Sequence, residues 1–69
     1  MKTVTIDQQY NVETKITHVT CEYRGKWVMS EILDPEYNDT LENSCFQHLR
    51  RLGFTHWKSK NGMINNRKL

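Results

Sequence analysis

The sequence predicts an α+β domain made of a three-stranded antiparallel sheet with one helix packed across one face, in the order β-β-β-α. Two β-rich runs flank Arg24-Gly25-Lys26, which predicts a hairpin, and residues 40–52 show helical periodicity with a marker at each end. A chain of 69 residues buries only about 60% of the surface that its unfolded form exposes. We therefore expect one small domain over residues 1–69.

Composition indicates a folded chain of modest stability. Apolar residues make up 36% of the sequence, aromatic residues 10%, and the formal net charge is +2. This aromatic content exceeds that of most disordered segments, and the small net charge excludes a strongly basic tail or an acidic nucleic-acid mimic as a description of the whole chain. A core of this size supplies roughly 3–5 kcal/mol of stability.

Three runs of alternating residues predict the strands. Residues 3–10 alternate apolar and polar side chains at their start, which predicts a short strand at a sheet edge. Residues 16–23 and 27–33 form the hairpin, in which Gly25 is expected at a bulged turn that pairs Glu22 with Lys26. This register predicts that Val19, Cys21, Trp27 and Met29 share the core face.

The helix over residues 40–52 is marked at both ends. Asp39 is the expected N-cap and Glu42 stands three residues later, the spacing of a capping box, while Gly53 is the expected C′ residue. The apolar stripe of the helix contains Leu41, Cys45, His48, Leu49 and Leu52. The complete expected core is Val4, Ile6, Val19, Cys21, Trp27, Met29, Leu41, Cys45, Leu49, Leu52 and Phe54.

The last part of the chain predicts a short C-terminal hairpin or a basic tail. Residues 54–59 have strand character, and Asn61-Gly62 is a strong two-residue turn signal. Residues 65–69 have little apolar surface to bury, so this end is expected to be frayed.

Charge is unevenly distributed along the chain, and this leads to the first function hypothesis. Every charged residue from Glu31 to Glu42 is an acid, whereas every charged residue from Asn43 to the end is a base. Cations mixed with rings and amides are typical of nucleic-acid binders. We expect a small non-enzymatic nucleic-acid-binding accessory protein in which the cations hold phosphates and Trp57 stacks on bases. Its expected contacts are Arg50, Arg51, His56, Trp57, Lys58, Lys60, Arg67 and Lys68.

The alternative hypothesis is a small protein-binding regulator or inhibitor, of the size that phages and mobile elements encode. Its interface would use the acidic segment and two exposed aromatic side chains, because an exposed aromatic ring beside acids resembles an interface anchor. The expected contacts are Glu36, Tyr37, Glu42 and Phe46. The partner of such a surface is another protein, including a second copy of this chain in a homodimer.

Metal binding and catalysis have weaker support. Cys45 and His48 share a helix face, but Cys21 is the only further ligand on that side and His18 points the other way, so the zinc set is incomplete. His56 between cations resembles the base of a small ribonuclease, although single histidines are common in binding surfaces. We expect no enzyme activity, no metal and no cofactor.

The expected compartment is the cytoplasm. No apolar run has the length of a membrane helix, and the first residues lack the apolar stretch of a signal peptide. The two cysteines, Cys21 and Cys45, are then expected as buried thiols, while one disulfide between them remains an alternative for an exported chain.

Overall fold

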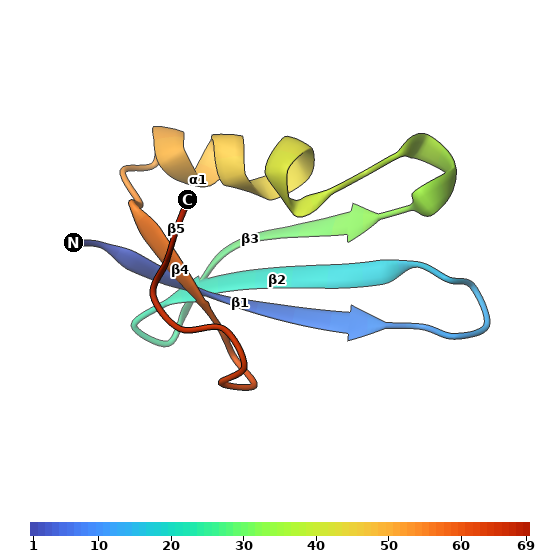
Figure 1. The fold of residues 1–69 in the computed structure, drawn as a ribbon, viewed down its shortest axis with the longest axis horizontal. Helices are drawn as coiled ribbons and strands as arrows, with labels where there is room; N and C mark the ends of the chain where they lie inside the picture. The colour runs from blue at the N-terminus through green and yellow to red at the C-terminus, as the bar shows by residue number, and fades with distance from the viewer.

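The computed structural model describes all 69 residues and contains a five-stranded mixed sheet with one short helical segment (Figure 1). The strand order in the sheet is β3-β2-β1-β4-β5. The elements are β1 (Thr3–Tyr10), β2 (Thr17–Tyr23), β3 (Lys26–Leu33), a 3-10 turn (Pro35–Tyr37), a π-helical turn (Glu42–Phe46), α1 (Gln47–Arg51), β4 (His56–Ser59) and β5 (Arg67–Lys68). No helix is long and apolar enough to cross a membrane.

The predicted three-stranded antiparallel sheet is wrong in its strand count and its type. β4 pairs with β1 in parallel, with Val4 opposite Trp57, and β5 then pairs with β4 in antiparallel orientation. The helical segment, which consists of the π-helical turn and α1, is the crossover that brings the chain to the side of β1 that β2 leaves unpaired. A parallel pair of strands needs such a crossover connection. β1 is therefore the central strand and not an edge, and the C-terminal hairpin extends the same sheet.

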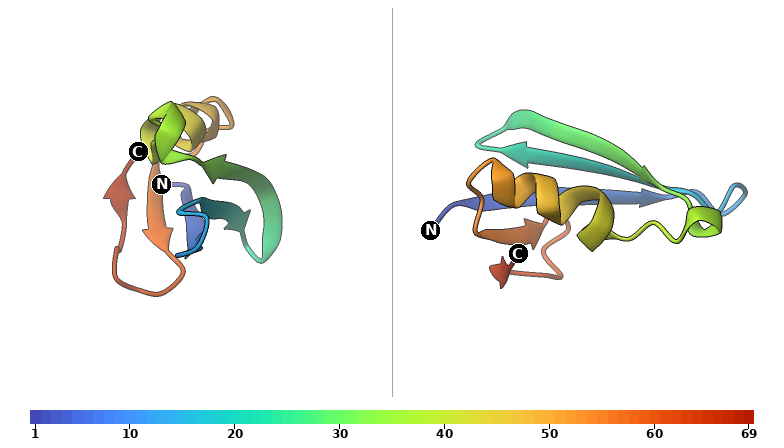
Figure 2. Two further views of the ribbon diagram at one scale, coloured as in Figure 1. Left: turned by 90° about the vertical axis from the view of Figure 1, so that its right-hand side faces the viewer. Right: turned by 90° about the horizontal axis from the view of Figure 1, so that it is seen from above.

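The core lies between one face of the sheet and the helical segment. Figure 2 shows this segment on one side of the curved sheet, with the other side uncovered. Alternate residues of the strands point toward the helix, and the side chains that become buried are Val4, Ile6, Val19, Cys21, Met29, Cys45, Leu49, Phe54 and Trp57.

The β2–β3 turn explains why Trp27 is absent from this core. Arg24 and Gly25 have positive φ angles of 53° and 78°, which is the two-residue type I′ turn and not the predicted three-residue bulged turn. Tyr23 then pairs with Lys26, Glu22 pairs with Trp27, and the register shifts before Cys21 pairs with Met29. Pairing with Glu22 places Trp27 on the uncovered face, where it is 68% exposed, and the bulge then returns Met29 to the core face. The predicted place of Trp27 in the core is therefore wrong.

The first helical residue is Leu41, one residue later than predicted. Thr40 and Asn43 form the capping box, because the Asn43 N–H donates to Thr40 Oγ1 at 3.2 Å and the Thr40 N–H donates to Asn43 Oδ1 at 2.8 Å. Asp39 instead accepts from the Asp34 N–H at 3.2 Å. Glu42, the other half of the predicted box, forms an ion pair with Arg50.

The C-terminal end of the helix agrees with the prediction. Gly53 has a φ of +94° and donates to Arg50 O at 3.0 Å, while the Phe54 N–H donates to Leu49 O at 3.1 Å. These two bonds are the Schellman pair, with glycine at C′.

The π-helical turn changes which side chains face the sheet. Cys45 and Leu49 are fully buried and Leu41 is half-buried, but His48 is exposed and Leu52 is 44% exposed. The predicted stripe assumes a uniform α-helical period, and the wider π turn interrupts that period. The placement of Leu52 in the core is therefore wrong.

The capping box gives a direct stability test. Thr40→Ala removes one side of the box, which costs about 1 kcal/mol and should lower the Tm by about 4–8 °C in a domain of this size. Glu42→Gln is the control, because an exposed ion pair contributes little and its loss should leave the Tm nearly unchanged. Thermal unfolding followed by circular dichroism measures both, and a larger loss with Asp39→Ala than with Thr40→Ala would move the start of the helix back to Asp39.

The C-terminal end is attached to the sheet, whereas the sequence indicates fraying over residues 65–69. Arg67 pairs with Trp57 and Lys68 pairs with His56. The Leu69 N–H donates to Thr55 O at 3.0 Å, so backbone pairing holds a segment that has little side-chain burial of its own.

Candidate nucleic-acid interface

The sheet face that the helix leaves uncovered is the main candidate site, and we call it the open face. Strand alternation and register define it, because paired residues in neighbouring strands point to the same side of a sheet. One row of paired residues runs Trp27–Glu22–Thr5–Lys58 across four strands, from β3 to β4. The open face comprises Thr3, Thr5, Asp7, Gln9, His18, Thr20, Glu22, Trp27, Ser30, Ile32, His56, Lys58 and Lys68.

Trp27 is the large aromatic side chain of the open face. Its indole Nε1–H donates to Ser30 Oγ at 2.8 Å, three residues along the same strand. The side chain is 68% exposed even though this hydrogen bond restricts its rotation. The hydrogen bond thus orients a ring that is open to solvent, as a stacking surface requires.

Lysines lie on the open face at the end of the row opposite Trp27. Lys58 pairs with Thr5 in register, and Lys68 pairs with His56. Lys60, in the turn after β4, reaches the same face, because its Nζ lies 3.5 Å from Glu22 Oε1. Asp7 accepts a hydrogen bond from the Gln9 side-chain amide at 3.1 Å. The carboxylates of Asp7 and Glu22 thus each have a partner within the face, while the ammonium groups of Lys58 and Lys68 form no ion pair.

The helix side holds the other cations predicted for this site. Arg50 makes two hydrogen bonds to Glu42, at 2.7 and 2.9 Å, and this pairing holds the pKa of the Glu42 carboxyl below its usual value. Arg51 is exposed in the last turn of α1. Arg67 pairs with Trp57, whose side chain points into the core, so Arg67 is also directed to the helix side.

Trp57 does not serve the role that its sequence context suggests. It is 3% exposed and packs against Phe46, with ring centroids 5.5 Å apart, and its Nε1 has no hydrogen-bond partner in the protein. A buried ring cannot stack on a base, so the predicted stacking role of Trp57 is wrong. Of the predicted nucleic-acid contacts, the structure brings together His56, Lys58, Lys60 and Lys68, and it separates Arg50, Arg51, Trp57 and Arg67 from them.

The protein-binding alternative keeps fewer of its predicted residues. Phe46 is half-buried against Trp57, so it is not the exposed anchor that the sequence predicts. Glu42 is bound to Arg50. Glu36 and Tyr37 remain accessible on the 3-10 turn, and Tyr37 is 75% exposed. This turn has a fixed shape because Asp34 caps it and accepts from the Glu36 N–H at 3.0 Å.

Sequence reasoning missed a hollow on the open face between β2 and β3. Its volume is about 400 Å³ and it is lined by His18, Val19, Thr20, Ser30, Glu31 and Ile32. No residue pattern indicates it, because it depends on the register of two strands. The exposure of Trp27 beside it had one sequence signal: a two-residue turn at Arg24-Gly25 forces a different register from a bulged turn.

The structure brings together no group of three His, Cys, Asp or Glu side chains that could hold a metal ion. His48, the helix residue considered as a zinc ligand, is exposed, whereas Cys45 is fully buried. The ribonuclease-like cluster is not assembled either, since Arg51 lies on the helix side and His56 Nδ1 contacts Thr55 Oγ1 at 2.8 Å.

The two cysteines are free, fully buried and adjacent in the core. The hydrogen bond with Cys45, together with burial, raises the pKa of the Cys21 thiol. No Cα of β2 lies within 8 Å of a Cα of residues 42–46, whereas a disulfide needs about 4.4–6.8 Å. The fold therefore does not permit the Cys21–Cys45 disulfide.

This arrangement predicts unreactive thiols. Alkylation by a maleimide should be at least about 100-fold slower in the native protein than in denaturant, because reaching either thiol requires opening most of the roughly 3–5 kcal/mol core. Mass spectrometry of the alkylated chain measures the rate. Rapid native labelling, or a Cys21–Cys45 disulfide formed under mild oxidation without loss of the circular dichroism signal, would contradict the packing described above.

No protein-family model matches this chain, and no curated protein or solved structure is significantly similar to it.

Proposed function

We propose that this protein is a small non-enzymatic accessory protein that binds nucleic acid through the open face. The observation that supports this proposal most directly is Trp27, a 68% exposed ring held by Ser30 on the same face as the lysines. Exposing so large an apolar side chain gives up about 1.5–3 kcal/mol of burial, and an apolar ring left outside with a fixed orientation is typical of a binding contact. Proteins that bind nucleic acid on a sheet commonly combine such rings with lysines.

The charges on the open face suit a polyanion at one end. Lys58, Lys60 and Lys68 outnumber Asp7 and Glu22, and both carboxylates already accept contacts from Gln9 or Lys60. Lys58 and Lys68 therefore have no carboxylate that competes with a phosphate. A cytoplasmic location is part of the proposal, since free buried thiols persist in a reducing compartment.

The salt dependence of binding tests this proposal. If Lys58 and Lys68 engage about two phosphates, log K against log salt should have a slope near -1.4 on single strands. Lys58→Ala should flatten the slope by about 0.7. Fluorescence anisotropy with labelled oligonucleotides of about ten nucleotides, within the range of single-strand site sizes, measures this slope.

The matched control is Arg51→Ala, which removes the same charge from the helix side. It should leave the slope unchanged, because Arg51 does not lie on the open face. If neither single-stranded nor duplex probes bind at low salt, the proposal fails. If Arg51→Ala and Lys58→Ala flatten the slope equally, binding is not located on the open face.

A second candidate function is protein binding through the 3-10 turn, favoured by the 75% exposure of Tyr37 on a capped turn that also carries Glu36. Tyr37→Ala should then abolish capture of a protein partner from a nuclease-treated lysate, while Lys58→Ala should not affect that capture. If nuclease treatment of the lysate instead abolishes capture by the wild-type protein, the result supports the nucleic-acid proposal.

A further inference from the structure

We infer that the open face binds an unpaired nucleobase, which stacks on Trp27 and places its edge in the hollow between β2 and β3. The ligand is then a single strand and not a duplex. This inference rests on the proposed function, because it specifies the form of nucleic acid and the contacts that recognise it.

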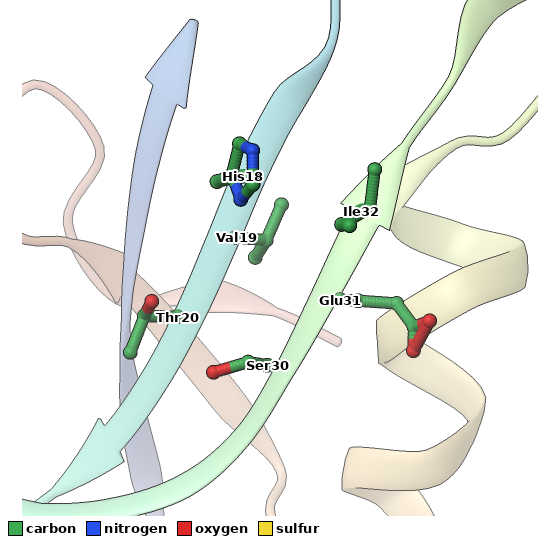
Figure 3. A pocket seen from close by; sticks show the side chains of 6 residues that line it. All are labelled: His18, Val19, Thr20, Ser30, Glu31 and Ile32. Carbon is green, nitrogen blue, oxygen red and sulfur yellow. The ribbon is translucent and has the colours of Figure 1, made fainter.

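The hollow is a small depression whose floor and walls come from three consecutive residue pairs. Val19 pairs with Glu31 at its centre, with the Thr20–Ser30 pair on one side and the His18–Ile32 pair on the other. Val19 is buried, and Figure 3 shows the Glu31 side chain directed toward the helix. The backbone of the central pair is therefore the floor, and the side chains of His18, Thr20, Ser30 and Ile32 are the walls.

Ser30 connects this hollow to the stacking ring. Its hydroxyl forms one wall of the hollow and also accepts the Trp27 indole hydrogen bond at 2.8 Å. The edge of the Trp27 ring that carries Nε1 is thus next to the hollow. A planar ligand stacked on Trp27 has one edge directed toward Ser30 and the residues beyond it.

The polar groups of the walls match the edge of a nucleobase. The hydroxyls of Thr20 and Ser30 can each donate and accept, and the His18 ring has a donor and an acceptor nitrogen when neutral. Base edges present donors and acceptors side by side, and Ser or Thr can pair with either kind. Ile32 adds an apolar contact at the far wall, where it is 52% exposed.

The position of Trp27 excludes a paired base. Because the indole Nε1–H donates to Ser30 of the same strand, the Trp27 ring lies along β3. The ring therefore does not project from the sheet as a wedge that could insert into a groove of a duplex. A paired base inside a duplex presents no face to such a ring, whereas bases of a single strand can be splayed and stacked. Stacking on Trp27 therefore requires an unpaired nucleotide.

The lysines lie at a distance that a single strand can reach. Trp27 and Lys58 are the two ends of one row across β3, β2, β1 and β4, which is three strand spacings or about 14 Å. A few extended nucleotides cover this distance. One base on Trp27 and a phosphate at Lys58 can thus belong to the same strand.

Tryptophan fluorescence tests the stacking contact directly. In a Trp57→Phe variant, Trp27 is the only tryptophan, and we expect oligo(dT), oligo(dC) or oligo(dA) of about ten nucleotides to quench its emission. In Trp27→Phe the remaining Trp57 is buried and should not be quenched. This second variant keeps the test valid if Trp57→Phe does not fold, because the quenching seen in the wild type must then be lost.

Affinity measurements separate the ring from the hollow. Trp27→Leu should weaken single-strand binding about 5- to 150-fold with an unchanged salt slope, whereas the control Tyr37→Leu, an exposed aromatic residue on the 3-10 turn, should not weaken it. Thr20→Val and His18→Leu should change the order of preference among the three homopolymers, because they remove hydrogen-bonding groups and leave Trp27 in place. The same sequence annealed into a duplex should bind at least about 10-fold more weakly than the single strand.

The possible failures are distinguishable. If no probe binds, the proposed function itself fails. If probes bind with the expected slope and respond to Lys58→Ala, but Trp27 is not quenched and duplex binds as well as single strand, the proposed function stands and this inference is overturned. If Trp27→Leu weakens binding but Thr20→Val and His18→Leu leave the preference unchanged, the stacking contact stands and base recognition by the hollow is overturned.

Discussion

Replacing Trp57 by alanine is expected to unfold the protein at 25 °C. The side chain is 3% exposed, contacts Phe46 and lies on β4 directly beside Val4 of β1. Large-to-small substitutions of this kind cost about 3–5 kcal/mol. That loss equals the roughly 3–5 kcal/mol that a domain of this size has in total. The circular dichroism spectrum of Trp57→Ala should therefore lack the native signal.

Trp27→Ala is the matched control, because it removes the same side chain from the open face. Its cost should stay near 0.5 kcal/mol, about that of a typical surface substitution. Trp57→Phe should be much milder than Trp57→Ala, because phenylalanine keeps the ring contact with Phe46 and removes an indole N–H that has no partner in the protein. Equal Tm losses for Trp27→Ala and Trp57→Ala would mean that the two tryptophans do not have the different environments described here.

Trp27 and Trp57 also show which burial predictions the sequence supports and which it does not. Alternation correctly placed Val19, Cys21 and Met29 in the core, because these positions keep one side of their strands. The same alternation placed Trp27 with them, because a bulge between Trp27 and Met29 leaves no trace in a pattern of period two. Trp57 was assigned to the surface because its neighbours are charged, although lysine neighbours on alternating positions are compatible with a buried ring.

The sequence predicts that the helix is present, but it predicts the start of the helix and its buried face less well. Its C-terminal end follows from Gly53, the residue type that adopts the left-handed conformation most readily. Its start was ambiguous because Asp39 with Glu42 and Thr40 with Asn43 offer competing boxes one residue apart, and only the backbone geometry selects the second. The π-helical turn has no known signal in this sequence, and it decides that Leu52 faces solvent.

The sheet topology was beyond local patterns. The pattern of residues 56–59 does not indicate which strand they pair with, because pairing between β1 and β4 joins residues more than fifty positions apart. The candidate site depends on this topology. His56, Lys58 and Lys68 share a face with Trp27 only because β4 and β5 continue the sheet beyond β1. The cluster of charges in the sequence could therefore predict some cations of the candidate site, but it could not predict that Trp27 is the aromatic ring of that site.

A proline in β4 tests this topology with the second large effect that we expect. β4 lies between β1 and β5 in the sheet. Every second N–H group along this segment donates to β1 or to the residue before it: the His56 N–H donates to Lys2 O at 3.2 Å and the Lys60 N–H donates to Ile6 O at 2.9 Å. The same alternation directs the Lys58 N–H to Val4 O. Lys58→Pro removes this donor in an internal strand, where proline is not tolerated.

The loss should exceed what the side chain alone contributes. Leaving the carbonyl of the fully buried Val4 unpaired costs about 1–3 kcal/mol, and the proline ring adds a steric conflict with the neighbouring strand. The Tm should fall by more than about 10 °C, at roughly 4–8 °C per kcal/mol. Lys58→Ala removes the same ammonium group but keeps the N–H, so its Tm should stay close to that of the wild type. A three-stranded sheet with a detached C-terminal hairpin would leave both variants equally stable, because no strand of the core would then depend on the Lys58 N–H.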